Sequence, residues 1–179
     1  MMAIGEFAIV KDKWRGIDVS YYVEPKFEKY ARMVFGNTPE MIEFFSQKFG
    51  VDYPWKKYSQ VVVRDFVSGA MENTTATVHM EALQHDHRYH LDETEEDYIS
   101  HELSHHWFGD YVTCESWANL PLNESFATYA EVLWREYKYG IDEAEHHLSG
   151  DFSSYFAESQ TKREPLIRFN GFQDHGHVS

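Results

Sequence analysis

The sequence is poor in cysteine and in positive charge, and it lacks a long apolar run. Cys114 is the single cysteine of 179 residues, so no disulfide can form within the chain. Lysine and arginine number 16 against 30 aspartates and glutamates, a formal net charge of −14. This balance disfavours nucleic acids and anionic membranes, which are bound through basic surfaces, and favours cationic ligands such as free amines.

No apolar stretch approaches the roughly 20 residues that span a bilayer, and the N-terminus lacks the basic start and apolar run of a signal peptide. We therefore expect a soluble chain without a membrane segment, whose compartment and oligomeric state stay open. The doubled methionine at the start and an ending without a helix stop suggest a piece of a longer protein.

Patterns typical of strands dominate the first half of the chain, and helical spacing dominates the second. Two β-prone runs around a glycine-containing turn predict a hairpin over 6–25, and further strands are expected over 59–66 and 74–81. Thr38 is expected to cap the second helix and Gly109 to follow the third. Helices are predicted over 25–36, 37–50, 97–108, 122–140 and 142–160.

Residues 99–110 read ISHELSHHWFGD, with two histidines four positions apart. On an α-helix His101 and His105 differ by about 400° of rotation and about 6 Å of rise, so both imidazoles leave the same face. This spacing suits two corners of a tetrahedral zinc site. Glu102 lies about 100° around the helix, where its carboxylate can take a proton from a water molecule at the metal. The segment matches the HExxH pattern of zinc peptidases.

A catalytic zinc site needs a third protein ligand and an open position. The metzincin arrangement is excluded, because it requires glycine at 108 and histidine at 111, where this chain has Phe108 and Tyr111. Glu124 is the better candidate, with 18 residues between it and His105 and a place in the first turn of a predicted helix. The alternative is that Glu124 only complements the helix dipole.

A second motif, GAMEN, occupies residues 69–73. The stretch HELSHHWFGD, the 18-residue gap and NESFA resemble the zinc-site motif of the aminopeptidase N family, the gluzincin zinc aminopeptidases, and GAMEN resembles that family's exopeptidase motif. The resemblance covers essentially the whole chain. It implies an α+β fold, the N-terminal part of a thermolysin-like catalytic domain, with a β-rich part over about 1–91 and a helical part over about 92–179.

The resemblance also implies a zinc-dependent aminopeptidase that removes N-terminal residues from peptides. One Zn²⁺ per chain would be bound by His101, His105 and Glu124, and Glu102 would activate the attacking water.

Peptides with a free N-terminus are the implied substrates, and Glu72 would bind their α-amino group. A carboxylate next to a strand edge offers charge-assisted hydrogen bonds to an ammonium. Accessible backbone at Gly69 and Ala70 would let a substrate pair with that edge as an added strand. The implied substrate-binding residues are Gly69, Ala70, Met71, Glu72 and Asn73.

Several further residues could support the site. Glu131 lies two helical turns after Glu124 and could accept the second N–H of a ligating histidine, or it could be an ordinary surface glutamate. His106 is expected to be packed or solvated, because it points about 100° away from His105. The histidines of 85–90 could hold a surface metal or belong to a solvated loop. Four aromatic residues are expected in the core around the site: Trp107, Trp117, Phe126 and Trp134.

The chain departs from the family pattern in three places. Ser125 stands where glycine is usual, and TTATVHME follows GAMEN in place of the commoner run, so the preferred substrate residue cannot be inferred. The tyrosine that stabilises the oxyanion in this family is expected beyond Ser179, and the family's N-terminal β domain and C-terminal helical domain would be missing partners. We therefore expect the chain itself to hydrolyse peptides weakly or not at all. Alternatives are a thermolysin-type endopeptidase and a non-catalytic binding protein that kept the fold.

Overall fold

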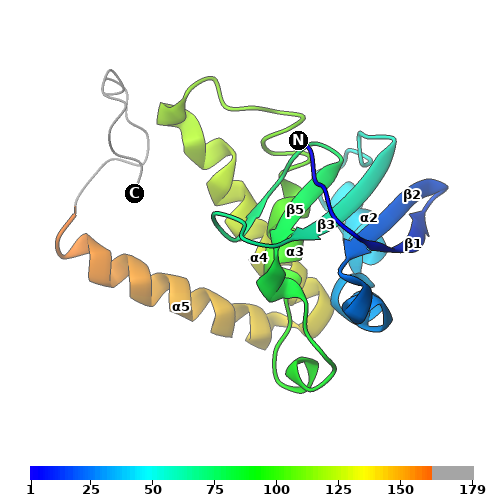
Figure 1. Ribbon diagram of the computed structural model, residues 1–179. Helices are drawn as coiled ribbons and strands as arrows, with labels where there is room; N and C mark the ends of the chain where they lie inside the picture. Colours follow the sequence, from blue (N-terminus) through cyan, green and yellow to red (C-terminus); the bar gives the residue numbers. More distant parts are fainter. Residues whose placement is uncertain (163–179) are drawn as a thin grey trace.

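The computed structural model describes residues 1–162 and is built around a five-stranded mixed sheet (Figure 1). The spatial order is β1-β2-β3-β5-β4, so β4 forms one edge. The pairs β1/β2 and β4/β5 are antiparallel, whereas β2/β3 and β3/β5 are parallel. The strands are β1 Ala8–Trp14, β2 Ile17–Val23, β3 Lys57–Val63, β4 Ala70–Met71 and β5 Ala76–Met80.

Burial follows the position of each strand in the sheet. The edge strand β1 alternates partly buried and exposed residues, while the central strand β3 is buried along most of its length. This explains the uninterrupted β-branched run in β3, because a central strand covered on both faces needs no polar side. The predicted hairpin is confirmed: Arg15 and Gly16 form its turn with φ values of 43° and 87°, the backbone that a tight two-residue hairpin requires.

The helices follow the predicted segments with shifted ends. The first predicted helix divides into a 3₁₀ segment, Pro25–Tyr30, and the short helix α1. Thr38 was predicted to cap α2, but this prediction was wrong because Asn37 takes the cap position. The Thr38 hydroxyl instead accepts a 2.7 Å hydrogen bond from the buried Gln60. The helices are α1 Ala31–Phe35, α2 Thr38–Phe49, α3 Glu96–Ser104, α4 Glu124–Tyr139 and α5 Ile141–Ser159.

The helix that carries the two histidines is shorter than predicted. It was expected to reach Phe108, but α3 ends at Ser104, and the chain then tightens into hydrogen bonds from His106 to Leu103 and from Trp107 to Ser104. His105 still has helical dihedral angles, with φ −57° and ψ −24°. The early end therefore leaves the relative placement of His101 and His105 on one face intact.

The core lies where α2 and α3 meet the sheet, and aromatic side chains fill much of it. Trp107 and Trp134 are buried there, as predicted, but Trp117 and Phe126 are 67% and 47% exposed, so the prediction was wrong for these two. Large buried side chains of the core include Tyr21, Phe35, Met41, Ile42, Phe45, Tyr58, Ile99, Leu103 and Trp134. None of the helices within 1–162 combines the length and apolar composition that crossing a membrane requires.

Candidate metal centre

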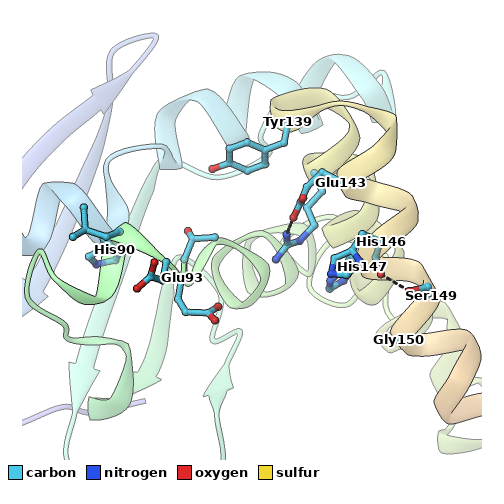
Figure 2. Close-up of a pocket in the computed structure, with 12 residues that line it drawn as sticks. His90, Glu93, Tyr139, Glu143, His146, His147, Ser149 and Gly150 are labelled. Atoms are coloured by element: carbon cyan, nitrogen blue, oxygen red, sulfur yellow. Dashed lines mark hydrogen bonds and ion pairs between the residues drawn. The ribbon is translucent and has the colours of Figure 1, made fainter.

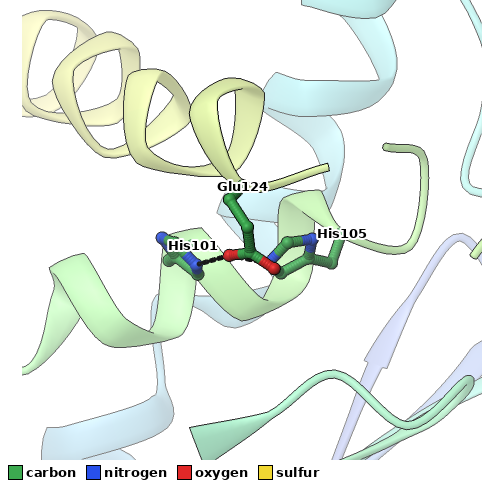
Figure 3. Close-up of side chains that lie close together, drawn as sticks. All are labelled: His101, His105 and Glu124. Atoms are coloured by element: carbon green, nitrogen blue, oxygen red, sulfur yellow. Dashed lines mark ion pairs between the residues drawn. The ribbon is translucent and has the colours of Figure 1, made fainter. Parts of the chain in front are cut away.

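Two helices bring the three predicted ligands together (Figure 3). His101 and His105 leave one face of the C-terminal end of α3, with ring centroids 4.8 Å apart. Glu124 is the first residue of α4, and its Oε2 lies 3.5 Å from Nε2 of each histidine. The three ligand atoms lie within 4.8 Å of one another, a spacing that one metal ion could bridge.

The other ring nitrogen of each histidine already has a partner. Nδ1–H of His101 donates to Oε1 of Glu131 at 2.7 Å, and Nδ1–H of His105 donates to the Phe108 carbonyl at 3.0 Å. These bonds fix both tautomers and leave the two Nε2 atoms facing Glu124. Glu131 therefore orients the imidazole of His101, as the partner of a metal-binding histidine would.

The donor set fits a zinc ion. Two imidazole nitrogens, one carboxylate and an open side are the ligands that catalytic zinc takes. Glu102 offers a second observation, because its Oε2 is buried and has no hydrogen-bond partner within the described chain. A buried oxygen without a protein partner beside these three residues is where a water molecule or ion would be accepted.

The pKa shifts of His101, His105 and Glu124 also fit a site for a cation. Burial lowers the pKa of His101, but Glu124 and Glu131 outweigh it and raise that pKa to about 10. Burial also lowers the pKa of His105, but the contact with Glu124 and the charge of Glu72 outweigh it. The pKa of His105 is therefore raised as well. The two histidines hold the pKa of Glu124 well below its ordinary value. The raised pKa values of the two histidines and the lowered pKa of Glu124 show that these three residues together favour positive charge between them.

Glu102 faces the same space from the buried side of α3. Burial, together with the negative charges of Glu72 and Glu124, raises the pKa of its carboxyl to about 7, against the opposing effect of the two histidines. A carboxyl that titrates near neutral pH can both accept and return a proton, which suits a general base.

The GAMEN segment lies at the edge of the sheet. Ala70 and Met71 form β4, which pairs with β5 on one side only, and the Gly69 carbonyl accepts the Met80 N–H at 2.9 Å. Glu72 and Asn73 follow directly and contribute to a cavity of about 530 Å³. The negative charge of Glu72 raises the pKa values of both Glu102 and His105, so the two parts of the site are electrostatically coupled.

Asp110 is a residue of this cavity that the sequence analysis missed. Its side chain is mostly buried, its Oδ2 has no hydrogen-bond partner within 1–162, and burial raises its pKa to about 6. The available signal was its spacing of four from His106, which lies inside the motif. His106 is packed, one of the two alternatives considered, and burial lowers its pKa to about 4.

A second group of side chains, from α3, α4 and α5, is also spaced closely enough to hold a metal ion. Asp97, Glu131 and His147 approach one another within 4.8 Å, with His147 Nε2 3.3 Å from Glu131 Oε2. Arg135 already binds both oxygens of Asp97, at 2.7 and 2.6 Å. Because the guanidinium neutralises this carboxylate, the group is better described as an ion-pair network that ties α5 to α3 and α4.

This network borders a cavity of about 850 Å³ between the loop around 90–94 and the start of α5 (Figure 2). Glu143 forms an ion pair with Arg135, and Figure 2 shows Glu143, His146 and His147 on α5 at the cavity. Of the histidine-rich loop 85–90, His85 pairs with Glu95 at 2.7 Å and stacks on Tyr89. Within the described residues, the loop histidines take part in neither metal-like group.

Comparison with known proteins gives consistent matches. Residues 33–171 match the Peptidase family M1 domain. Aminopeptidase N of Streptomyces lividans is 38% identical over 125 residues, 65% of this chain and 14% of the relative. Aminopeptidase 2 of Candida albicans is 31% identical over 161 residues, 83% and 17% respectively. Glutamyl aminopeptidase of Bos taurus is 35% identical over 126 residues, 66% and 13%.

These alignments cover less than a fifth of the length of each of these three relatives, but they cover most of this chain. The family match includes every candidate ligand and the whole GAMEN segment. With the match spanning 33–171, the chain belongs to peptidase family M1, as its resemblance to the aminopeptidase N family implied.

Proposed function

We propose that this chain carries the zinc site and part of the substrate site of an aminopeptidase, within a thermolysin-like catalytic domain. One observation supports the proposal above all: the Nε2 atoms of His101 and His105 converge on Oε2 of Glu124. The next residue after His101 is Glu102, whose buried Oε2 has no hydrogen-bond partner within residues 1–162. A site of this composition serves metal-assisted hydrolysis of a carbonyl. The α+β organisation, with the sheet edge next to the helix pair, gives a peptide a place to lie.

In this proposal His101, His105 and Glu124 hold the ion. Zinc, when bound, polarises the scissile carbonyl and lowers the pKa of water. Glu102 then accepts the proton of the attacking water through its carboxylate and returns it to the departing amine. Its burial supports both steps, because the raised pKa keeps proton transfer in either direction close to balanced at neutral pH.

The GAMEN segment supplies the preference for an N-terminal residue. Within residues 1–162, β4 has a strand partner on one side only, so the substrate backbone can add along its other edge as a further strand. Glu72 follows the strand and is electrostatically coupled to Glu102, so its carboxylate can bind the substrate ammonium close to the scissile bond. A free α-amine is therefore the feature that this site recognises.

The test is binding of an amino-acid hydroxamate, with its α-amine free or acetylated, to the zinc-loaded chain. We expect the free form to bind more tightly and Glu72→Gln to remove the difference. Equal affinity for both forms would favour the endopeptidase alternative, because an endopeptidase tolerates a blocked N-terminus. Hydrolysis of an aminoacyl reporter, where it is measurable, should fall by about 10²–10⁴-fold in Glu102→Gln. Unchanged turnover in that variant would contradict the role of Glu102.

A further inference from the structure

The turn that follows the GAMEN segment has an unfavourable backbone. The Asn73 carbonyl accepts the Ala76 N–H at 2.7 Å, which closes a four-residue turn over 73–76. Thr75 occupies its third position with φ +68°. Turns with a positive φ at this position normally have glycine or asparagine there, and a β-branched residue in this conformation is a genuine outlier. Contacts from outside the turn must therefore hold it.

Two contacts from outside hold Thr75 through its backbone. Its carbonyl accepts the Ser59 N–H of β3 at 2.9 Å, and its own N–H donates to Nε2 of His106 at 2.9 Å. The second contact is unusual, since a side chain at the end of the metal-binding helix replaces a backbone acceptor. It links the turn after Glu72 to the segment that carries Glu102.

The imidazole of His106 is itself held firmly in place by its surroundings. It is fully buried, lies perpendicular to Tyr58 with centroids 4.9 Å apart, and packs against Tyr53 at 5.7 Å. Its Nδ1–H donates to the Glu102 carbonyl at 3.2 Å. Nε2 accepts and Nδ1 donates, so one neutral tautomer satisfies both bonds. The ring thus bridges the backbones of Thr75 and Glu102 directly.

We propose that His106 is a positioning residue, whose buried imidazole holds the 73–76 turn against the backbone of Glu102 so that Glu72 keeps its place opposite the metal ligands. This inference rests on the proposed function, since it assigns Glu72 to the substrate amine. His106 neither binds the metal nor contacts the substrate in this role. Asp110 lies beside the same bridge, with Oδ2 3.8 Å from His106 Nε2, but the bridge itself consists of the two hydrogen bonds of the imidazole.

The experiment compares three variants of the zinc-loaded chain with the wild type: His106→Leu, His106→Gln and His106→Leu combined with Thr75→Gly. Leucine removes the acceptor, glutamine keeps a side-chain oxygen for the Thr75 N–H, and glycine adopts φ +68° without strain. The readouts are zinc per chain and the ratio of affinities for the free-amine and acetylated hydroxamates. The wild-type ratio tests the proposed function, and its change among variants tests the inference.

We expect His106→Leu to reduce the free-amine preference by up to about 100-fold, the size of effect that a displacement of about 1 Å produces, with zinc content retained. His106→Gln and the added Thr75→Gly should each restore most of the preference. If His106→Leu keeps the free-amine preference unchanged, the proposal is overturned. It is also overturned if His106→Leu loses both the preference and zinc and His106→Gln restores neither. A wild type without any preference would instead contradict the proposed function.

A measurement on the wild type keeps the proposal testable if His106→Leu does not fold. The Thr75 amide nitrogen and His106 Nε2 should show a scalar coupling across their hydrogen bond in nitrogen-15 NMR spectra. The Thr75 amide should also be protected from hydrogen exchange. Absence of the coupling together with rapid exchange would overturn the bridge that the proposal requires.

Discussion

Helices α3 and α5 both carry histidines and acidic residues, yet they differ sharply in burial. Six of the nine residues of α3 are buried, among them Glu102, whereas Ala144 is the one buried residue among the 19 of α5. Helix α3 lies within the core between α2 and α4, while α5 packs on α4 and extends away from the sheet (Figure 1). Similar residue types therefore meet very different surroundings.

This difference in burial changes the chemical behaviour of similar residues on the two helices. Burial removes water from the carboxyl of Glu102, so its pKa responds strongly to neighbouring charges. On α5 His146 is exposed, whereas the adjacent His147 is half-buried and enters an ion-pair network with Asp97 and Glu131. Helix α4 lies between the two and contributes Glu124, whose side chain is 47% exposed. The proposed ligand set is thus buried at His105 and half-exposed at Glu124.

The largest expected effect is the loss of zinc when Glu124, the half-exposed member of the proposed ligand set, is replaced. Glu124→Ala should lower zinc from about one ion per dialysed chain to nearly none, because two imidazoles alone do not complete the site. Metal mass spectrometry measures the content. Glu136→Ala, an exposed glutamate on the same helix, is the matched control and should retain zinc. Equal zinc in both variants would mean that Glu124 is not a ligand.

The next effect contrasts the burial of α3 and α5 directly. Leu103→Ala removes a fully buried side chain and should cost about 2–5 kcal/mol in the free energy of unfolding. Phe152→Ala removes a larger side chain that is 53% exposed on α5, and the change should stay within about 0.5 kcal/mol. Urea unfolding of both variants provides the comparison. A cost at Phe152 as large as that at Leu103 would show that α5 is covered in solution.

A smaller effect is expected where the ion-pair network meets the metal site. Glu131→Gln keeps an oxygen for Nδ1–H of His101 but removes the charge that stabilises this contact. Zinc affinity should fall by about 10-fold, the lower end of the range for such partners of ligating histidines. Competition with a chromophoric chelator measures the affinity, and Glu145→Gln on the exposed face of α5 serves as the control. Unchanged affinity in Glu131→Gln would reduce the contact to a surface interaction.

The strongest sequence predictions concerned features that local spacing determines. The spacing of four between His101 and His105 fixes their shared face once the segment is helical, and the structure keeps that face even though α3 ends early. The hairpin over 6–25 followed from its turn and its β-prone runs. Glu124 depended in addition on how two helices pack: its place in the first turn of a predicted helix made it the candidate, and the family resemblance then supported it.

Features that depend on distant partners could not be predicted in the same way. Thr38 is the first residue of α2 rather than its cap, and its hydroxyl accepts a hydrogen bond from Gln60 of β3, a partner 22 positions away. Trp117 and Phe126 were predicted as core residues, yet Trp117 is 67% exposed and Phe126 is 47% exposed even though its ring stacks on Phe108. The contact of His106 with Thr75 joins residues 31 positions apart, and no local pattern in the sequence specifies it.

The smallest expected effect is a pH dependence of the metal-free chain that zinc removes. The raised pKa of His101, about 10 against an ordinary 6.5, contributes stability that is fully present below pH 6.5 and is lost as pH rises through 10. The lowered pKa of Glu124 contributes stability above its ordinary 4.5 that is lost as pH falls. Solvent screening of the half-exposed Glu124 keeps both contributions modest.

The metal-free chain should therefore unfold at a lower temperature at pH 9 than at pH 6.5, after subtraction of the change seen in a His101→Gln variant. The zinc-loaded chain should not show this decline, because the ion replaces the proton on Nε2. Calorimetric scans of both forms measure it. A decline of equal size with and without zinc would place the titrating group outside the ligand set, and the charge argument for the metal centre would then rest on Glu102 alone.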